Sequence, residues 1–404
     1  MTPGILRGLC VVEGSAFVAA PLGGMTLAQL GADVIRFDQI GGGPDARRWP
    51  LDAGGNSLFW AGLNKGKRSI RIDLRSPDGQ ELAAALITRS GADAGIFLTN
   101  FPARAWLAYE TLKSRRADLI MVALTGNHDG TSEIDYTVNP ATGFPAVTGP
   151  RGSTEPVNSV LPAWDIAMGT LAAVGVLAAE RHRRATGAGT LVRLALSDVA
   201  LAMVGNLGRL AQAELGVPAP GKDGNYLYGA FGRDFSTRDG RRVMVVALTD
   251  RQWQSLKAAT GLDAAGLAAT TGLDLENEGG RFAARDAVAA VLEPWFAARD
   301  FADVERTLTA GGVSWGPYRA FSELVREDER ASPRNPMFAP VTHPGSGVYL
   351  TPASPLDFSA VARVPPLPAP RLGEHTDEIL ADLLGLPASE IGKLHDRGVV
   401  AGPT

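Results

Sequence analysis

The sequence has little of what builds disulfide bonds and metal sites. Cys10 is the only cysteine among 404 residues, so no internal disulfide can form and a zinc site of four thiolates is excluded. The five histidines are scattered, and none has a second histidine four residues away, as a helical zinc motif requires. We therefore expect no metal site, a reducing cytoplasm as the location, and a buried, unreactive Cys10.

A strong net charge and a long apolar run are lacking as well. The formal charge of −4 gives no reason to expect nucleic acid or an anionic membrane as a partner. Glu13 and Ser15 interrupt the apolar start of the chain, so no signal peptide is predicted. The longest apolar run, residues 166–179, is too short and too rich in glycine and threonine for a membrane span. Hydrophobic residues still make up 45% of the chain, which is enough for a large core.

Three motifs of nucleotide and hydrolase chemistry are absent from the sequence. A dinucleotide-binding turn needs closely spaced glycines directly after the first strand, and Gly14-Ser15-Ala16-Phe17 does not match that spacing. Gly41-Gly42-Gly43 follows the second predicted strand, which is the wrong place. There is no Walker loop and no Gly-x-Ser-x-Gly elbow. A nicotinamide oxidoreductase is therefore the last of our hypotheses.

Strands and helices alternate over the first part of the chain. Short apolar runs predict strands, and amphipathic segments between them predict helices. The strands are expected at 9–13, 32–37, 70–74, 94–98 and 119–124, and the helices at 21–31, 78–90 and 104–113. This alternation predicts a doubly wound, Rossmann-like α/β domain with a parallel sheet. A helix over 166–183, apolar nearly all round and so expected to be deeply buried, and a strand over 191–196 would complete it.

The composition changes where glycine and proline cluster, at residues 216–235. We therefore predict a large domain over 1–215 and a smaller α+β domain over 216–330. A proline-rich segment, expected to be loops through residue 370 with helices at 376–384 and 388–397, makes up residues 331–404.

Cations gather in the loop before the third strand. Lys65, Lys67 and Arg68 follow Leu63 in this loop. By composition alone, a solvated loop is the commoner case. The functional alternative is a phosphate clamp, in which lysine and arginine neutralise a polyanion such as the diphosphate and 3'-phosphate of coenzyme A.

A second candidate binding segment follows the strand at 94–98. Asn100, Phe101 and Arg104 lie where ligands bind in doubly wound folds, after the carboxyl end of a strand. An aromatic ring flanked by an amide and a guanidinium is suited to bind an adenine ring and its phosphates. The same residues also fit a helix start, with Asn100 as the cap and Pro102 in the first turn, and both interpretations can hold together.

Asp165 begins the long apolar helix. Local sequence alone favours an N-cap aspartate. The functional interpretation uses the same geometry, because a helix N-terminus stabilises the carboxylate and keeps it ionised, ready to attack a thioester.

Taken together, these segments resemble the class III CoA transferases. Residues 64–74 look like the cationic loop and strand of the family, and Asn100-Phe101 with Arg104 resembles its adenine-side turn. Residues 371–378, Arg-Leu-Gly-Glu-His-Thr-Asp-Glu, match its C-terminal signature closely, and the ending at 390–400 fits too. The resemblance covers nearly the whole chain, but the signature does not separate transferases from racemases.

The resemblance implies an interlocked homodimer with catalysis at the interface between chains. The large domain would bind CoA and the C-terminal segment would return to it. CoA would be part of an acyl-CoA substrate, with no permanently bound cofactor. The residues that the resemblance places at CoA are Ser15, Ala16, Phe17, Arg36, Leu63, Lys65, Lys67, Arg68, Asn100, Phe101 and Arg104.

The implied mechanism depends on Asp165. Its carboxylate would attack the acyl-CoA thioester to form a mixed anhydride, and the CoA thiolate would then form an aspartyl-CoA thioester. An acceptor carboxylate would reverse both steps, so that no ATP is needed. Backbone N–H groups near the aspartate would hold the oxyanions.

Three stretches resemble those family members that move CoA between the two carboxyls of one dicarboxylate. They are residues 12–19, residues 135–139 with 143–145, and residues 162–165. Donor and acceptor would then be one molecule, which predicts a closed, tight site. Arg47 or Arg48 would hold the free carboxylate, and Tyr136 is a further candidate for substrate contact.

The sequence differs from its relatives at two places, and these differences rank the alternative functions. Ile134 stands where the α-methylacyl-CoA racemases have a proton-transferring histidine, and an alkyl side chain cannot move a proton. The tetraglycine loop of some formyl-CoA transferases is missing, and residues 221–225 are the nearest candidate for a lid. An intermolecular transferase, then a racemase, and a CoA-ester-binding protein without turnover remain open.

Overall fold

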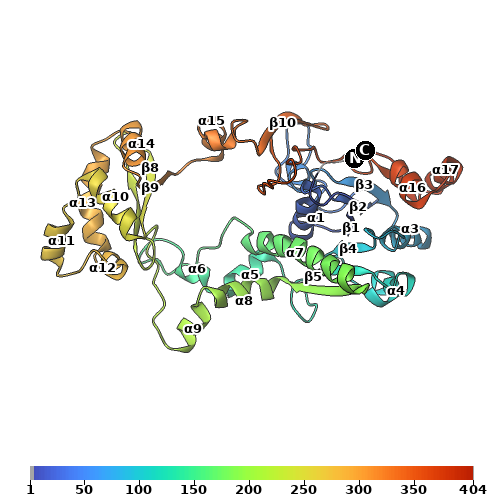
Figure 1. Ribbon diagram of the computed structural model, residues 1–404, viewed down its shortest axis with the longest axis horizontal. Coiled ribbons are helices and arrows are strands. Elements are labelled where there is room, and N and C mark those ends of the chain that lie inside the picture. Colours follow the sequence, from blue (N-terminus) through green and yellow to red (C-terminus); the bar gives the residue numbers. More distant parts are fainter. Residues whose placement is uncertain (1–3, 404) are drawn as a thin grey trace. The chain divides into compact units, whose positions relative to one another are not determined.

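The computed structural model describes residues 4–403, which divide into two compact units (Figure 1). Of the described residues, the first unit contains 4–142, Ser159–Arg209 and 329–403, and the second contains Gly143–Asn158 and Leu210–Asp328. The chain thus leaves the first unit twice and returns to it for its last segment.

A seven-stranded sheet forms the centre of the first unit. Its order is β12-β3-β2-β1-β4-β5-β6, and all neighbours are parallel except β12, which runs antiparallel to β3. The order from β3 to β6 is that of a Rossmann fold. The predicted α/β fold with a parallel sheet is therefore confirmed. The strands are β1 (Cys10–Gly14), β2 (Asp33–Gln39), β3 (Arg68–Ile72), β4 (Ile96–Thr99), β5 (Ile120–Thr125), β6 (Thr190–Ala195) and β12 (Val400–Ala401).

Helices cover both faces of this sheet. On one face α1 (Ala19–Gln29) packs against α7 (Ala163–Thr186), and α7 also contacts β4, β5 and β6. On the other face the apolar side chains of the strands form one cluster with those of α3 (Pro77–Ile87), α4 (Tyr109–Arg115), α16 (Thr376–Leu384) and α17 (Ala388–Asp396). The sheet is thus buried on both sides, which explains the near-continuous apolar runs of its strands.

Local sequence explains where several helices begin and end. Ser76 caps α3 by accepting a hydrogen bond from the Gly79 N–H, and Pro77 occupies the first helical position. Helix α7 ends at Gly187, whose φ of 75° lies in the left-handed region. The predicted helix at 104–113 is interrupted: a 3-10 turn at Ala105–Leu107 precedes α4, because Ala108 is extended between them.

The expectation that the long helix is buried all round is wrong. The side chains of Leu171 and Val174 on α7 are 37% and 54% exposed, whereas Ala172 and Val176 are fully buried. Helix α7 is long and apolar enough to cross a membrane, but core helices of soluble proteins can be equally long and apolar. A third of its most apolar 18 residues is buried. The helix instead packs against α1 and the sheet, and an apolar strip is left on its outer side.

The second unit is built on a three-stranded antiparallel sheet. Its strands are β7 (Phe231–Ser236), β8 (Arg242–Ala247) and β9 (Ser314–Pro317). Its core contains Trp253, which is fully buried, and the stacked rings of Phe235 and Phe296, whose centroids are 4.5 Å apart. The helices of this unit are α6 (Phe144–Val147), α10 (Asp250–Thr260), α11 (Ala264–Thr271), α12 (Glu278–Ala283), α13 (Arg285–Ala297), α14 (Phe301–Ala310) and α15 (Phe321–Glu327), with α9 (Arg209–Glu214) at the boundary.

The C-terminal segment is more ordered than its proline content suggested. Residues 331–370, expected to be loops, contain an antiparallel hairpin of β10 (Phe338–His343) and β11 (Gly347–Pro352). The β-branched and aromatic residues of these strands outweigh the prolines. The signature at 371–378 has a structural role, because the Gly373 N–H donates to Ser69 Oγ and the His375 N–H donates to the Ser69 carbonyl oxygen of β3.

Candidate functional site

The site begins where the strand order of the sheet reverses, between β1 and β4. Ligands of doubly wound folds bind at this position, outside the carboxyl ends of the strands. The loops that follow β1 and β4 are joined there: the Ala16 N–H donates to Asn100 Oδ1 at 2.9 Å, and Asn100 Nδ2 donates to the Ala16 carbonyl oxygen at 2.7 Å. Asn100 therefore joins two loops and is not a helix cap, which corrects one of its two interpretations.

Phe17 is exposed at this junction. Its φ is 67°, in the left-handed region that few non-glycine residues adopt, and its ring is 44% exposed. Its neighbours Ser15 and Ala16 are buried, as is Thr99 at the end of β4. Phe101 is partly buried, and its ring meets Phe37 edge-on at 6.2 Å. Arg104 is exposed. The loop thus presents one aromatic ring outward at the switch point.

A buried charge network lies beneath the loop. Arg36 is fully buried, pairs with Asp38 at 3.0 Å and Asp45 at 2.9 Å, and donates to the Ser15 carbonyl oxygen at 3.0 Å. Lys67 is also buried and pairs with Glu13 at 2.8 Å. The interpretation of this region as a solvated loop is therefore wrong.

Arg36 and Lys67 meet at Asn64. The Asn64 Oδ1 atom accepts from Arg36 Nη1 at 3.0 Å and from Lys67 Nζ at 2.9 Å. Gly24 makes room for the Glu13 carboxylate, since a Cβ at this position would lie 1.7 Å from Glu13 Oε2. Both cations are thus paired with protein groups. Arg36 also supports the loop after β1, because it donates to the Ser15 carbonyl oxygen.

The other predicted cations lie apart from this network. Lys65 is buried, its Nζ donates to the Gly62 carbonyl oxygen, and burial lowers its pKa to about 8. Leu63, the last residue of α2 (Leu58–Leu63), is partly buried. Arg68 lies at the amino end of β3, where it pairs with Asp33 and with Glu378 of α16. Arg68 is therefore at the opposite end of its strand from the switch point.

Asp165 lies in the first turn of α7, two residues after the helix begins. Pro162 is the N-cap residue, so the N-cap interpretation of Asp165 is wrong. The first-turn N–H groups are taken by another carboxylate: Asp135 Oδ2 accepts from the Trp164 N–H at 2.8 Å and from the Asp165 N–H at 3.1 Å. These two N–H groups are therefore not free to hold an oxyanion.

The electrostatics of Asp165 also differ from the expectation. Burial, followed by the charge of Asp135, raises the pKa of Asp165 to about 6, and the nearby Arg48 opposes this shift. Asp135 accepts two of the first-turn N–H groups that could otherwise have bonded to and stabilised the Asp165 carboxylate. At pH 7 Asp165 is mostly ionised and more basic than an ordinary aspartate, and both properties suit a nucleophile.

Arg48 connects Asp165 to the loop after β1. Its guanidinium lies over the ring of Phe17 at 5.6 Å and over the ring of Phe59, in α2, at 5.2 Å. Because Arg48 is close enough to Asp165 to affect its pKa, these groups share one site in the first unit. Arg47 is exposed, and Tyr136, the second residue of α5 (Asp135–Ala141), is 45% exposed.

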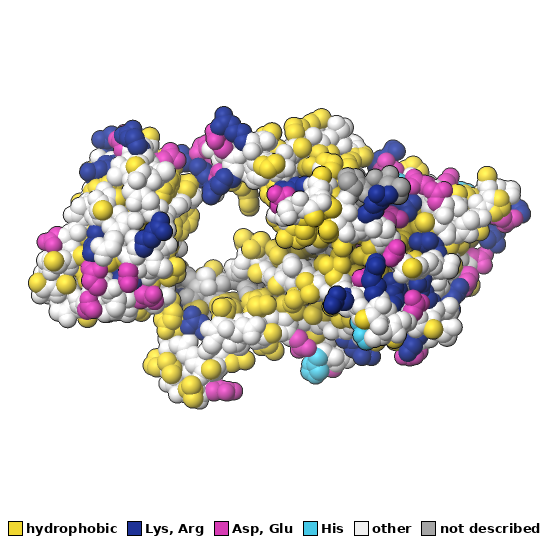
Figure 2. Space-filling model, in the orientation of Figure 1, with side chains coloured by type: hydrophobic (Ala, Val, Ile, Leu, Met, Phe, Trp, Pro, Cys, Tyr) yellow, Lys and Arg dark blue, Asp and Glu magenta, His cyan; other side chains and the backbone are white. Residues whose placement is uncertain are grey.

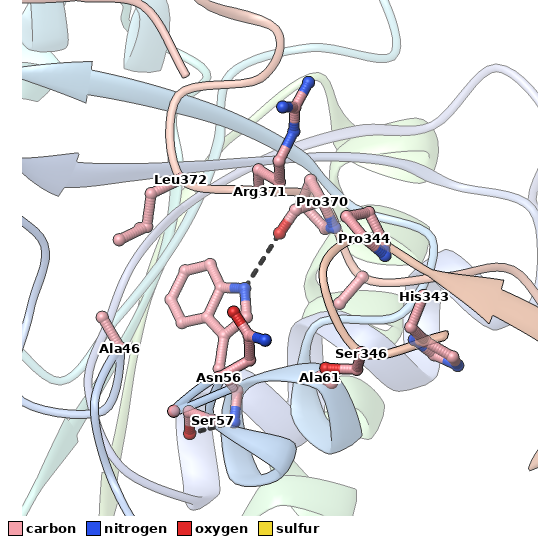
Figure 3. Close-up of a pocket in the computed structure, with 13 residues that line it drawn as sticks. Ala46, Asn56, Ser57, Ala61, His343, Pro344, Ser346, Pro370, Arg371 and Leu372 are labelled. Atoms are coloured by element: carbon pink, nitrogen blue, oxygen red, sulfur yellow. Dashed lines mark hydrogen bonds between the residues drawn. The ribbon is translucent and has the colours of Figure 1, made fainter. Parts of the chain in front are cut away.

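A cavity of about 160 Å³ lies in the first unit (Figure 3). Its walls come from α2, the hairpin turn and the signature segment, and the indole N–H of Trp60 donates to the Pro370 carbonyl oxygen at 2.9 Å. Arg371 points away from Asn56 and Ser57 in Figure 3. Neither Asp165 nor Arg48 lines this cavity.

Sequence reasoning named residues 135–139 only as a stretch of resemblance and gave no role to Asp135 or Asn139, and it did not name Phe59. Asn139 Oδ1 accepts from the Trp164 indole N–H at 2.9 Å and so fixes the ring next to Asp165. The signal that was available is the pairing of Asp135 and Asn139 on one face of a helix, four residues apart. The partner of these side chains lies about thirty residues away in the chain, and no local pattern identifies it.

The chain belongs to CoA-transferase family III, whose family model matches residues 6–376. It is 62% identical over 403 residues to 2-methylfumaryl-CoA isomerase of Chloroflexus aurantiacus, with 99% of this chain and 98% of that protein covered. It is 29% identical to succinyl-CoA:mesaconate CoA-transferase of Haloarcula hispanica, with 93% and 96% covered. A solved structure, a CAIB/BAIF family protein from Brucella suis, matches with a TM-score of 0.76 at 26% identity, covering 94% of this chain and 100% of that one. The predicted family is therefore confirmed.

Proposed function

We propose that the protein is a 2-methylfumaryl-CoA isomerase. It would move CoA from one carboxyl of mesaconate to the other and convert 2-methylfumaryl-CoA into 3-methylfumaryl-CoA. The observation that carries this proposal is the 62% identity over almost the whole length of both chains to a protein of that name. The placement of a basic, half-buried Asp165 beside Arg48 supports it.

The reaction would proceed through two covalent states of Asp165. A carboxylate oxygen of Asp165 attacks the thioester carbon, the C–S bond breaks, and a mixed anhydride and CoA thiolate form. The thiolate then attacks the aspartyl carbonyl, which releases mesaconate and leaves an aspartyl-CoA thioester. After mesaconate turns over, its other carboxylate repeats the two steps in reverse. Each step exchanges one acyl bond for another, so the sequence needs no external energy source.

CoA would be bound at the switch point. The exposed ring of Phe17 and the exposed guanidinium of Arg104 are suited to direct contact. Arg36 and Lys67 would act indirectly, because they hold Ser15 and Asn64 in place from within the protein. Arg48, between two phenylalanine rings and close to Asp165, would hold the carboxylate of the substrate that is not bonded to CoA.

A homodimer with its catalytic sites at the interface between chains is part of this proposal. Figure 2 shows hydrophobic side chains gathered over α7 and α8 (Leu196–Asn206). Val174 on α7 and Leu201 on α8 are 54% and 47% exposed, and Leu207, directly after α8, is 65% exposed. An apolar face of this kind is typical of a surface that a second subunit covers. The domains would be a CoA-binding part over 1–215, a small domain over 216–330 and a returning segment over 331–404.

The test is to incubate the purified protein with 2-methylfumaryl-CoA alone and to separate the products by chromatography with mass detection. We expect a new CoA ester of identical mass. Isotope-labelled free mesaconate added to the reaction should not enter the product, because the intermediate acid stays in the site. If the reaction needs an added acid, the protein is an intermolecular transferase, the activity named for its relative of 29% identity.

Arg48→Ala should lower kcat/KM for 2-methylfumaryl-CoA by roughly 10- to 100-fold, since a hydrogen bond to a charged group is worth about 1.5–3 kcal/mol. Arg48→Lys should recover part of this loss, because lysine keeps the charge but not the planar stacking on Phe17 and Phe59. Removal of Arg48 should also shift the acid limb of the pH profile to higher pH, since Arg48 lowers the pKa of Asp165.

Arg47→Ala is the matched control for Arg48. It removes an exposed cation from the adjacent position of the same loop. We expect a change of less than threefold. A larger loss in the Arg47 variant than in the Arg48 variant would move the carboxylate site to Arg47. Steady-state kinetics of the purified variants decide between the two.

A further inference from the structure

Asp135 faces the first turn of α7 from a separate helix. It begins α5, and its side chain is buried, with 3% of its surface exposed. One oxygen of its carboxylate accepts the backbone N–H groups of both Trp164 and Asp165. This is the hydrogen bonding of a helix cap, but the cap comes from outside the helix, about thirty residues earlier in the chain.

This contact brings two carboxylates together in the proposed site. The Asp135 oxygen lies 3.1 Å from the backbone nitrogen of Asp165, and the Asp135 charge acts on the Asp165 carboxylate. Two like charges so close disfavour the state in which both are ionised. Asp135 is buried and Asp165 is partly buried, so water screens the repulsion less than it would at an exposed site.

The charge of Asp165 changes during the proposed reaction. The free side chain is an anion, whereas the mixed anhydride and the aspartyl-CoA thioester are neutral at this position. Acylation therefore removes the repulsion between the two side chains. The negative charge moves to the CoA thiolate and, after the second step, to the released mesaconate.

We propose that Asp135 is a positioning residue that both orients Asp165 and drives it toward its acylated states by charge repulsion. The inference rests on the proposed function, because it requires Asp165 to be the acylated residue. It adds a role for a side chain that does not touch the reacting atoms. The hydrogen bonds fix the backbone of the nucleophile, and the charge makes its carboxylate more basic and less stable as a free anion.

Few other charges face Asp165. Helix α1 carries no charged side chain, and neither do β4 and β5. Helix α8 carries only Asp198, β6 carries only Arg193, and the side chains of both are exposed. Arg48, from the loop before α2, is the cation that acts on Asp165. Asp135 is thus the carboxylate opposed to Arg48 at the nucleophile.

Asp135→Asn separates the two parts of the role. Its amide oxygen can still accept from both N–H groups, so the orientation is kept while the charge is lost. We expect the midpoint of the acid limb of kcat/KM to move to lower pH by about 0.5 to 1. The fraction of enzyme trapped as the aspartyl-CoA thioester, measured by mass spectrometry of the Asp165 peptide, should fall by roughly 3- to 10-fold.

Asp263→Asn is the matched control. Asp263 caps α11 in the second unit by accepting the Gly266 N–H at 2.9 Å, so the same change is made at a cap remote in sequence. It should leave the pH profile and the adduct unchanged. Circular dichroism and thermal melting check that both variants fold.

The outcomes separate this inference from the proposed function. If the wild-type protein forms no adduct at Asp165, the proposed function fails. If the wild type forms the adduct and Asp135→Asn has the same acid limb and the same adduct fraction, the role of Asp135 is overturned. Should Asp135→Asn not fold, Asp135→Ser replaces it, because its hydroxyl oxygen can still accept a backbone N–H and carries no charge. An acid limb at lower pH with less adduct would support the inference, and a wild-type limb and adduct fraction would overturn it.

Discussion

Asp165→Asn is expected to be inactive and, at neutral pH, more stable than the wild-type protein. Asparagine has almost the same shape as aspartate but cannot form the anhydride or the thioester. Loss of a nucleophile commonly lowers kcat by several orders of magnitude, and we expect a loss of roughly 10⁴-fold or more. No CoA adduct should form at this position. Product assays and mass spectrometry of the intact protein measure both effects.

The gain in stability follows from the pKa of Asp165. Folding raises the pKa of Asp165 from 3.8 to about 6. The ionised carboxylate is therefore less stable in the folded state than in the unfolded state. Below pH 3.8 the side chain is neutral in both states and the substitution should change little. The advantage of asparagine should develop as the pH rises from 3.8 to 6, and reach about 1–2 kcal/mol above it.

Urea unfolding of both proteins at pH 4.5 and pH 8 tests this sign. If Asp165 were a helix-capping residue that stabilises the fold, its replacement would lower the free energy of unfolding at pH 8. That result would contradict the arrangement in which Asp135 provides the cap. Asp198→Asn, a change of an exposed aspartate on the neighbouring α8, should alter neither activity nor stability by more than about 0.5 kcal/mol.

The sequence predicted the parallel sheet well because each buried strand is a short apolar run. The strands around Val12, Val34 and Val122 all lie in the sheet, and the six parallel strands have the Rossmann order. The long helix was harder to predict. Apolar residues lie on all sides of the axis of α7, a pattern that predicts a fully buried helix. In the folded chain, however, Leu171 and Val174 face outward. A surface that another subunit covers has the same composition as a core, so periodicity cannot separate the two.

The candidate site could be predicted only in part, for a different reason. Asp165 was singled out as a candidate because it begins a predicted apolar helix, and a helix start is a local feature of the sequence. The partners that set its chemistry, Asp135 and Arg48, come from distant segments, and only the fold brings them together. Arg36 and Lys67 were expected at CoA, Arg36 from the family resemblance alone and Lys67 also as part of a phosphate clamp, but both are buried among protein groups. The partners, Glu13, Asp38 and Asp45, are visible in the sequence but not as a cluster.

Arg36→Met should be the most destabilising substitution in the site region. Arg36 lies among three buried carboxylates: its guanidinium is 3.0 Å from Asp38, 2.9 Å from Asp45 and 3.8 Å from Glu13. Methionine fills part of the volume but leaves Lys67 as the remaining cation of the network. Breaking a buried ion pair by removing one partner costs about 3–5 kcal/mol, because an uncompensated charge stays inside. We expect a loss of this size in urea unfolding at pH 7.

The control is Arg184→Met, which removes an exposed arginine from its pairs with Glu180 and Asp93. Surface pairs contribute little, so this variant should lose at most about 1 kcal/mol. An equal loss in both variants would show that burial does not set the strength of the Arg36 network.

The Arg36 variant also links stability to catalysis. Arg36 donates to the Ser15 carbonyl oxygen, and the next residues of that loop are bonded to Asn100 and carry Phe17 toward Arg48. Folded Arg36→Met protein should therefore bind its CoA ester less tightly, because the loop after β1 is displaced. Its KM should rise by a larger factor than its kcat falls, because Asp135 keeps its contact with Asp165 at the start of α7. Acid should reduce the stability defect, since burial raises the pKa of Asp38 and protonation of this carboxylate removes part of the charge that Arg36 neutralised. A variant with wild-type KM would mean that the loop holds its conformation without the network, and that the buried cations stabilise the fold alone.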